Sequence, residues 1–557
     1  LGFVHQIPYE GYSVYGKKGT SYNQLTLDGR GLRTSGKIDY LTSTLESDDF
    51  VYYIDSVTTT GTRAQIREGV VGQASFPDVK VEEYRMRWIP HKDSMYVRNI
   101  KEPFVLYKET ASLEGTAIVS SNGLFGAGKL LTRGSEAISG SLFFSNNNYT
   151  ARHATFEIKS SSPSKPAFTG QDVRLNFNLI EDVAEISPEV AGVAALEFPY
   201  AQFKTSITNA TWNLEDKTVT MSKPDDVDIS KSYFYATRKA LDSLAFNATE
   251  AVYDINKLEL NVSGIPYIKV ADAKITPEDN KVLILENAVF DRFDNTTIVL
   301  DTLNEYHNLY KGDITILSRN KFEGDATYLY VNSVSDTFSI KMGSFELVED
   351  PYSTRRQKRY HTVSSGEVLE ADKLTLAPGL LYKGKMTMYA NKPALELDGY
   401  VRLELSNMAD NSWIVYKSSS DEEMGVIHIA TSITDEGESV AAGLFIDSQT
   451  EELYATLLSS KRSPDDHPVF ITDGYLSYDA PKNEYKVVDS RYVGIDYTGR
   501  LFTYNETNTD VRAEGKINFL PPTKDFAIDA VGIGKGNMND AKFMFNTMLG
   551  FKFDIPT

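Results

Sequence analysis

Apolar and polar residues alternate along most of the chain with a period of two, the pattern of half-buried β-strands. Clear runs of this kind are Lys257–Val262, Lys281–Leu285, Val401–Leu405 and Glu484–Val488. Clusters of Asn, Asp, Gly and Pro separate such runs and are typical of tight turns. Helical periodicity is scarce, and only Ser187–Leu196 and Asp540–Leu549 allow one or two helical turns. The pattern predicts an all-β protein with very little helix.

A segment near the start of the chain is repeated. Gly31–Ile38 recurs 92 positions later as Gly123–Leu130, with the Gly-Lys step conserved between the copies. An aromatic strand follows each copy, at Phe50–Tyr53 and at Leu142–Phe144. The repeat predicts a duplicated β-module of about ninety residues.

A second, shorter unit recurs further along. It consists of a small residue, an aromatic residue, a polar turn and an alternating strand, as in Ala210–Met221 and Ala251–Leu260. Looser copies begin at Ala273, Ala326 and Gly474. We interpret each copy as one β-hairpin. Hairpins that cannot bury their apolar face alone are expected to stack into an elongated structure, a solenoid, an open jelly-roll or a series of β-sandwich modules.

These repeats suggest four regions. Residues 1–105 would be the first β-module and 106–200 its duplicated copy. Residues 201–365 would hold β-hairpin repeats, which continue through 366–557. Because the chain starts and stops abruptly within the pattern, we expect it to be part of a longer, modular protein.

Charge and cysteine content narrow the setting. The 557 residues carry a formal charge of -20, which opposes a polyanion-binding surface, so we expect no nucleic-acid partner. The chain has no cysteine, which excludes disulfides, thiolate metal sites and cysteine nucleophiles and favours an oxidising compartment such as a periplasm or cell surface. No run of 18 apolar residues is present, so no transmembrane helix is expected.

One dense basic cluster stands out in this acidic chain. It consists of Arg355, Arg356, Lys358 and Arg359, directly after a turn at Asp350–Pro351. The simpler interpretation is a solvated loop. The functional alternative is a contact with an acidic partner or a lipid headgroup, since clustered cations bind phosphate well.

Motifs for catalysis and cofactors are weak. Gly123–Lys129 has the form of a phosphate-binding loop, but Leu130 replaces the Ser or Thr that binds magnesium and no helix pattern follows, so we interpret it as a turn between two strands. Asp465–Pro468 and Asp225–Asp228 are weak candidates for a cation site. The sequence has no G-x-S-x-G nucleophile elbow. A pair of carboxylates for glycoside cleavage stays open. We predict no enzyme activity and no cofactor.

Two further sets of residues bear on the setting. Trp88, Trp212 and Trp413 are interpreted as core residues, with stacking on sugar rings as the alternative. Four Asp-Ser/Thr-aliphatic triplets resemble the O-glycosylation signal that Bacteroidota use on periplasmic and surface proteins. Their acceptor residues are Ser56, Ser94, Ser243 and Thr302.

The repeats resemble two known groups of proteins. Ala251–Gly264, with its small-x-Tyr-Asp turn and alternating strand, is similar to the OstA-type repeat of lipopolysaccharide-transport proteins, which implies an open β-jelly-roll with an apolar groove for acyl chains. Longer stretches, among them Ser35–Phe50, Val270–Ile275 and Tyr382–Met388, resemble large uncharacterised envelope proteins of Bacteroidota. This second resemblance implies a location but no activity.

Together these features predict a non-enzymatic structural or binding component of a bacterial cell envelope. We expect it in the periplasm or on the surface of a Gram-negative bacterium, within an outer-membrane protein assembly. One alternative is a conduit for lipid or lipopolysaccharide, and another is a surface glycan-binding protein.

Overall fold

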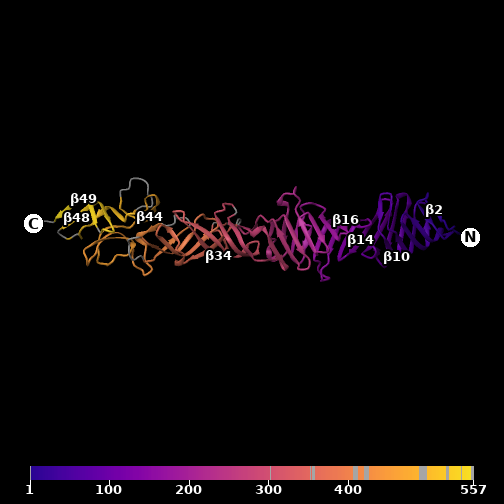
Figure 1. The fold of residues 1–557 in the computed structure, drawn as a ribbon, viewed down its shortest axis with the longest axis horizontal. Coiled ribbons are helices and arrows are strands. Elements are labelled where there is room, and N and C mark those ends of the chain that lie inside the picture. Colours follow the sequence, from indigo (N-terminus) through magenta and orange to yellow (C-terminus); the bar gives the residue numbers. More distant parts are fainter. Residues whose placement is uncertain are drawn as a thin grey trace. The chain divides into compact units, whose positions relative to one another are not determined.

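The computed structural model describes residues 2–301, 303–351, 353, 358–405, 412–419, 426–488, 499–521, 523, 526–540 and 542–553. Within these residues the regular elements are β-strands and short 3-10 turns, so the all-β prediction is confirmed (Figure 1). No helix in this part of the chain has the length and apolar character needed to cross a membrane. The chain forms two compact units, which are described separately. Unit 1 comprises 1–270, 275–293 and 315–319, and unit 2 comprises 271–274, 294–314 and 320–557.

The first half of unit 1 is a sheet built around long antiparallel strands. The long strands are β5 (Gly31–Tyr40), β6 (Ser43–Tyr52), β7 (Val57–Ile66), β10 (Val79–Ile89), β13 (Ala111–Ser120), β14 (Gly123–Thr132), β15 (Ser135–Phe144), β16 (Asn148–Ile158) and β17 (Phe168–Asn178). Shorter strands accompany them: β1 (Phe3–Gln6), β2 (Tyr12–Val14), β3 (Gly19–Ser21), β4 (Gln24–Asp28), β8 (Gly69–Val71), β9 (Ala74–Phe76), β11 (Ser94–Asn99), β12 (Phe104–Leu106), β18 (Val183–Pro188) and β19 (Leu196–Phe198).

Most of the long strands turn a corner near the middle, where the alternation of buried positions steps by one; these strands are β6, β7, β10, β15, β16 and β17. In β6 the buried positions are 43, 45 and 47 and then 50, so two consecutive residues, Asp48 and Asp49, point outward. Strand β7 steps in the same way, with Thr62 and Arg63 outward. A step of this kind lets both halves of a strand bury the same face, which folds the sheet upon itself. Strand β10 shows the fold directly, because one half pairs with β11 and the other with β12.

The interior between the two halves is filled by side chains. Leu45 and Phe50, from opposite sides of the corner in β6, are both fully buried, and so is Trp88 in β10. Side chains of both halves border a gap of only about 10 Å³, among them Val79 from one half and Val119 from the other. A gap of this size holds one water molecule at most. The folded sheet therefore encloses a packed core.

The two copies of the repeated module use the same hydrogen bonds at equivalent positions. Ser47 Oγ donates to the carbonyl of Thr60 at 3.1 Å and accepts from the N–H of Asp49 at the corner. Ser139 Oγ, 92 positions later, donates to the carbonyl of Arg152 at 2.6 Å and accepts from the N–H of Ser141. At the corner, some backbone N–H and carbonyl groups are not hydrogen-bonded to the neighbouring strand. The two serines form hydrogen bonds with these groups, as polar groups away from water require.

The repeated Gly-Lys segments correct one prediction. Gly31–Lys37 and Gly123–Lys129 lie along strands β5 and β14, with a shift of register before Gly36 and before Gly128, and are not turns between strands. The sequence contains Gly there because the strand bulges: Gly36 has φ +121° and Gly128 has φ +143°. The conclusion that these segments are not phosphate-binding loops does not depend on this detail.

The second half of unit 1 consists of short hairpins in two facing ladders. Its strands are β20 (Phe203–Thr205), β21 (Asn209–Asn213), β22 (Thr218–Ser222), β23 (Tyr233–Ala236), β24 (Ala245–Asn247), β25 (Glu250–Asp254), β26 (Glu259–Ser263), β27 (Ile268–Val270), β28 (Ala273–Thr276), β29 (Val282–Leu285) and β30 (Val289–Phe290). One ladder runs β18–β21–β22–β25–β26–β29 and the other β19–β20–β23–β24–β27. Phe198 of the second ladder contacts Tyr253 of the first, with ring centroids 5.0 Å apart.

The two clear hairpins predicted from the second repeat, Ala210–Met221 and Ala251–Leu260, are confirmed. Trp212 lies opposite Val219 in the pair β21–β22, and Tyr253 lies opposite Leu260 in the pair β25–β26. All four side chains are buried. Hence each copy contributes one aromatic cross-strand pair to the core between the ladders.

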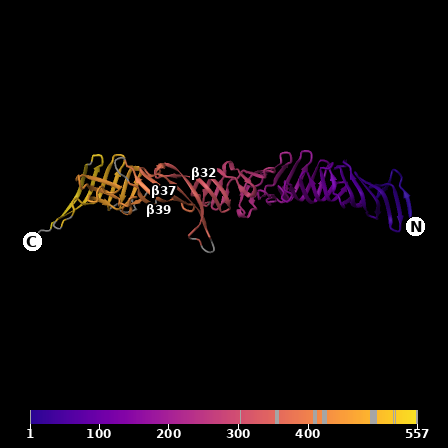
Figure 2. The same cartoon turned by 90° about the horizontal axis from the view of Figure 1, so that it is seen from below.

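Unit 2 contains a run of long strands followed by two smaller sheets (Figure 2). The strands from residue 293 to 418 are β31 (Phe293–Leu300), β32 (His307–Ser318), β33 (Lys321–Val331), β34 (Thr337–Glu349), β35 (Tyr360–Val368), β36 (Thr375–Ala377), β37 (Leu380–Tyr389), β38 (Glu396–Leu403) and β39 (Ile414–Ser418). Of these, residue 293 and residues 315–318 at the end of β32 belong to unit 1. The corner design recurs there, since Ser364 Oγ donates to the carbonyl of Gly343 at 2.7 Å beside a bulge in β34.

The last part of unit 2 holds a three-stranded and a seven-stranded sheet. The first pairs β41 (Ala441–Ile446) with β42 (Leu453–Ser459) and β43 (His467–Thr472). The second runs in the order β40 (Ile427–His428), β44 (Tyr475–Asp479), β45 (Glu484–Val488), β46 (Leu501–Asn505), β47 (Asp510–Ile517), β48 (Phe526–Asn537) and β49 (Lys542–Phe553).

Both helical predictions are wrong. Most of Asp540–Leu549 belongs to strand β49, and the segment Ser187–Leu196 connects the end of β18 to the start of β19 without a helix. In β49 the tertiary pairing with β48 along twelve residues favours the extended chain. In the second segment Gly192 has φ +83°, which ends any helical turn.

Candidate functional site

The seven-stranded sheet of unit 2 has one apolar face that is buried at one end and uncovered at the other. Two rows of cross-strand neighbours define it: Tyr485–Tyr504–Val511–Gly536–Phe543 and Val487–Phe502–Ala513–Gly534–Phe545. Over β45, β46 and β47 these side chains are buried. Over β48 the same face is mixed, with Gly534 buried and Gly532 and Gly536 half-buried, and over β49 it passes from half-buried to exposed. An apolar face that continues from the core into solvent marks a contact surface.

Glycines in β48 shape this face. Gly532, Gly534 and Gly536 alternate along the strand and point to the apolar side. A Cβ on Gly534 would lie 2.7 Å from the ring of Phe545, which shows that the ring lies across the neighbouring strand. The ring of Phe543 covers Gly536 in the same way. Aromatic side chains that cover glycines of an adjacent strand stabilise a sheet edge and hold the rings in place.

The last strand is an edge. Strand β49 pairs with β48 and, within the described residues, with no other strand (Figures 1 and 2). On its apolar face Leu549 is 46% exposed, Phe551 53% and Phe553 64%. On the opposite face Met544 and Met548 are about as exposed as an unfolded chain would leave them, at 78% and 82%. Free backbone groups and exposed apolar side chains together make this edge able to accept a further strand.

The opposite face of the same sheet carries charge. A depression of about 690 Å³ is lined by Arg512, Lys535 and Lys542 and by Glu484 and Asp510. Arg512 forms an ion pair with Glu514. The depression holds both cationic and anionic side chains, so neither sign of charge dominates it. We therefore place the candidate site on the apolar face and the free edge.

An ion-pair network occupies a corner of the folded sheet in unit 1. Glu189 accepts hydrogen bonds from Arg152 Nε at 2.8 Å and from the N–H of His153, and Arg174 lies 3.4 Å away. The hydrogen bond from Arg152, together with that from His153, lowers the pKa of Glu189 to about 2. His153 in turn contacts Asp172 at 2.8 Å. The carboxylate joins β16, β17 and the end of β18, so its role is to hold the corner.

The Asp465–Pro468 cluster also has a structural role. Asp466 is buried and accepts hydrogen bonds from Tyr454, from the N–H of Ser448 and from the N–H of Ser463. Burial by itself raises the pKa of Asp466, but these hydrogen bonds outweigh it and lower the pKa to about 2. His467 contacts the carbonyl of Asn518 instead of sharing a site with Asp466. Among the described residues, no group of three potential metal-ligating side chains is present.

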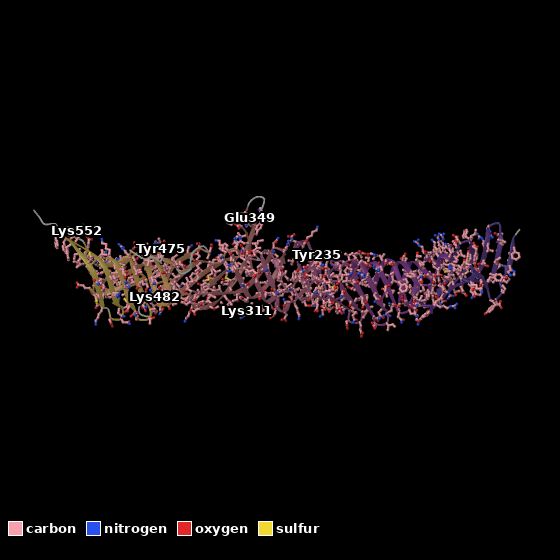
Figure 3. All side chains as sticks on the ribbon, turned by 90° about the horizontal axis from the view of Figure 1, so that it is seen from above. Tyr235, Lys311, Glu349, Tyr475, Lys482 and Lys552 are labelled. Carbon is pink, nitrogen blue, oxygen red and sulfur yellow. The ribbon has the colours of Figure 1, made fainter. Side chains whose placement is uncertain are left out.

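The predicted basic cluster is described only in part. Arg355 and Arg356 lie outside the described residues. Lys358 Nζ forms an ion pair with Glu349 Oε2 at 3.1 Å, beside the end of β34, where Figure 3 labels Glu349. Its pKa is raised by the hydrogen bond to this carboxylate. The backbone N–H of Asp350 donates a hydrogen bond to the carbonyl of Arg359. The contact with an acidic partner or lipid stays a prediction.

The predicted glycosylation sites differ in their accessibility. Ser243 is exposed in the turn before β24, with φ +56°. Ser94 is half-buried at the start of β11, whereas Ser56 is buried and donates to Asp55. Thr302 lies outside the described residues. Ser243 is therefore the acceptor that an enzyme could reach most easily.

The three tryptophans are core residues. Trp88, Trp212 and Trp413 are buried, with at most 7% of their surface exposed. Lys383 Nζ and the Arg402 guanidinium lie 4.1 and 4.5 Å from the centroid of Trp413, which closes that ring off further. None of the three offers a face for a sugar ring.

The sequence pattern of residues 540–549 suggests a helix and therefore does not indicate an apolar edge strand. The signal that identifies it is the unbroken alternation of Phe543, Phe545, Thr547, Leu549, Phe551 and Phe553. In comparisons with known proteins, no family model matches the chain, and no curated protein matches it either.

Proposed function

We propose that this protein is a non-enzymatic structural or binding component of a bacterial cell envelope, where it supports an assembly of outer-membrane proteins. The observation that carries the proposal is the packed interior of the folded sheet in unit 1. Leu45, Phe50 and Trp88 leave no room for an acyl chain between the halves. A body of this kind acts through its outer surface and its edges.

The outer surface of the folded sheet supports the same function. Residues that point away from the core along β10 are charged, among them Lys80, Glu82, Arg85 and Arg87. Strand spacing repeats at a constant interval of about 4.8 Å, so such side chains form regular rows. Rows of fixed polar groups suit the binding of a protein partner along several strands.

Two carboxylates with strongly lowered pKa values favour a structural role over catalysis. Glu189 and Asp466 are each surrounded by hydrogen-bond donors that stabilise the ionised form. A general acid or base needs a pKa near the working pH, and these two groups are far from it. Their donors join neighbouring segments instead.

The envelope setting rests on three sequence features. The chain lacks cysteine, which fits an oxidising compartment. Ser243 stands exposed within an Asp-Ser-Leu triplet, as an O-glycosylation acceptor would. The resemblance to large envelope proteins of Bacteroidota points to the same place.

The rival function is a conduit for lipid or lipopolysaccharide. The observation that favours it is the folding of one sheet into two halves that bury a common apolar face. To serve as a conduit the halves would have to separate, which would expose a row of side chains that are now fully buried.

Affinity purification of the full-length protein from its native membrane, with mass spectrometry of proteins and lipids, tests the proposal. We expect a stoichiometric outer-membrane protein and no retained lipid. Photo-crosslinking distinguishes the rival: a benzoylphenylalanine at Phe50, inside the folded sheet, would crosslink lipid only in a conduit. The same probe at Arg85, which points outward, is the matched control. Retained lipid together with crosslinking at Phe50 alone would overturn the scaffold proposal.

A further inference from the structure

Three arginines on the outer face of the folded sheet in unit 1 have no partner for their charge. Arg85 and Arg87 point outward from β10, Arg98 points outward from β11, and all three are exposed. Among the residues that the structure describes, none of these side chains forms an ion pair, a hydrogen bond or a contact with an aromatic ring. Arg85 lies directly opposite Arg98, and like charges in this position destabilise a strand pair.

The outward charges in the other half of the same sheet are arranged differently. Across β5, β6, β7 and β10 the residues opposite one another are, in order, Lys37, Glu46, Arg63 and Glu82. Each charge there has a neighbour of opposite sign, which stabilises strand pairing. The three arginines depart from this pattern in a chain whose formal charge is -20. Because the stability of the sheet does not account for them, they indicate a ligand.

An apolar row begins beside the arginines and crosses the sheet towards β14 and β15, where Figure 1 labels β10 and β14. Tyr96, which is 38% exposed, lies between Arg87 on β10 and Ile118 on β13. Phe125 and Phe143, both half-buried, continue the row, with ring centroids 5.1 Å apart. At a strand spacing of about 4.8 Å, the strip from β10 to β15 is about 19 Å long.

Hydroxyl groups border the charged end of this strip. Each arginine has a threonine opposite it on a neighbouring strand; these residues are Thr58, Thr60 and Thr116. A hydroxyl both donates and accepts hydrogen bonds. The strip therefore combines cations, hydroxyl groups and aromatic rings, which together suit a ligand that has carboxylates, hydroxyls and apolar ring faces.

The position of the strip inside the sheet distinguishes two kinds of extended ligand. Strands β10, β11, β13, β14 and β15 are each paired on both sides, so the sheet has no free edge here. An extended peptide binds a sheet through the backbone groups of an edge, and on this face its own N–H and carbonyl groups would lack partners. A polysaccharide made of sugar acids has no peptide groups and can bind through side chains alone.

The negative charge of the whole chain does not prevent such binding. Salt at physiological concentration screens charges over about 8 Å, so a polymer on the strip responds mainly to the arginines beneath it. Two acidic side chains of the same strands are already paired, Asp49 with Arg33 and Glu83 with Lys101. Their charges are therefore largely compensated.

We propose that the three arginines and the apolar row beside them bind an acidic polysaccharide that lies across β10–β15. Arg85, Arg87 and Arg98 bind its carboxylates, since a planar guanidinium donates two parallel hydrogen bonds to a carboxylate. Tyr96 and the rings beyond it pack against the sugar rings. The proposed function places a protein partner on the outer surface. This inference goes beyond it and does not rest on it, because it adds a second ligand on one strip of that surface.

A labelled oligogalacturonate, a short chain of sugars that each carry a carboxylate, is the probe. Its fluorescence anisotropy is followed as the purified full-length chain is added, at physiological salt and with a chelator that removes calcium. We expect saturable binding. The fully methyl-esterified oligomer has the same sugars without the charge and should bind at least about tenfold more weakly.

Two double variants with the same loss of charge test the arginines. Arg85→Gln with Arg98→Gln should raise the Kd for the probe at least about tenfold. Arg63→Gln with Lys80→Gln, in the other half of the sheet, should change the Kd by less than about twofold. All four side chains are exposed, and circular dichroism checks that the variants fold. Because Arg85 and Arg98 repel each other, their double variant should be at least as stable as the unmodified chain.

A second pair of variants tests the sugar contact. Tyr96→Ala should raise the Kd for the probe about threefold or more, because it removes the exposed ring beside the arginines. Tyr53→Ala is the matched control, since Tyr53 is 55% exposed in the turn after β6 and lies outside the strip. It should leave the Kd unchanged.

Four outcomes would overturn the inference. The first is an oligogalacturonate that does not bind, or binds no better than its methyl ester. The second is equal weakening by the two double variants, which places the site elsewhere. The third is a Tyr96→Ala variant that binds like the unmodified chain. The fourth is poly-glutamate of the same length binding as tightly as the sugar, which indicates an acidic protein segment as the ligand. None of these readouts involves an outer-membrane protein, so failure here and failure of the proposed function are distinguishable.

Discussion

The long strands of unit 1 and the last hairpin of unit 2 are similar in length but bury their side chains differently. In β6 the inward positions run 43, 45, 47 and then 50, and both halves of the strand are covered. In β49 the apolar positions run from 543 to 553 without a step, and the strand is exposed on both faces. The stepped strand β6 folds into a packed core, whereas β49, which has no step, keeps much of its apolar face exposed.

The difference shows what a strand needs in order to be buried. A strand that turns a corner brings a second layer over its own apolar face, as Phe50 and Leu45 do within β6. A straight strand must obtain that layer from elsewhere. In β49 glycines on β48 let Phe543 and Phe545 lie flat, which covers these two rings only in part. The remaining apolar surface is available for association.

The largest expected effect comes from the core of the folded sheet. Trp88 is fully buried. The centroid of its ring lies 5.6 Å from that of Tyr15 and 5.0 Å from that of Tyr40. Trp88→Ala should lower the free energy of unfolding of unit 1 by about 3–5 kcal/mol, because it leaves a large cavity. Phe553→Ala, on the exposed edge, should change stability by less than about 1 kcal/mol. Urea denaturation, monitored by hydrogen exchange, measures the free energy of unfolding of each variant. Equal losses of stability in the two variants would contradict the difference between the packed core and the exposed edge.

A smaller effect is expected at a corner glycine. Gly128 has φ +143°, and a Cβ there would lie 2.2 Å from the carbonyl oxygen of Glu114. Gly128→Ala should therefore destabilise unit 1 by about 2–3 kcal/mol. Gly140, in the next strand, has no atom within 4 Å of such a Cβ and no left-handed conformation. Gly140→Ala should be neutral, or stabilising by a few tenths of a kcal/mol. Thermal denaturation of the two variants measures both changes in stability.

The corner serines should show that the two copies of the module are equivalent. Removing the hydroxyl of Ser47 or of Ser139 leaves a partly buried carbonyl without that donor, so each Ser→Ala variant should lose about 1 kcal/mol. Ser141→Ala, at an exposed position beside the same corner, serves as the control and should lose less than about 0.5 kcal/mol. A loss in one copy alone would show that the copies use their corners differently.

The smallest expected effect depends on pH. Because the pKa of Glu189 falls from its ordinary value of 4.5 to about 2 on folding, its contribution is present above pH 4.5 and is lost as the pH falls towards 2. Arg152 and Arg174 are more than half exposed, so the contribution is about 1 kcal/mol or less. Glu189→Gln should be less stable than the unmodified protein at pH 7, and the gap should close at low pH. A gap that widens on acidification would contradict this assignment.

Much of the fold could be predicted from local patterns. The hairpins of Ala210–Met221 and Ala251–Leu260 could be predicted because their turns and apolar positions lie within a dozen residues of each other. The candidate edge could not be identified in the same way. The structural roles of Glu189 and of Asp466, which the sequence indicated only as part of a candidate cation site, could not be predicted, because their donors come from segments far apart in the sequence or are backbone groups.

The sequence by itself determined that the chain is all-β, that it repeats, and that it lacks the residues for thiol chemistry, because alternation, turn residues and composition are local properties. Only the tertiary structure decided that Gly36 and Gly128 mark bulges inside strands and that the interior of the folded sheet is filled. It also decided that residues 542–553 form an edge strand instead of a helix. These features depend on which strands pair and which faces meet, and burial of apolar surface between distant segments settles both.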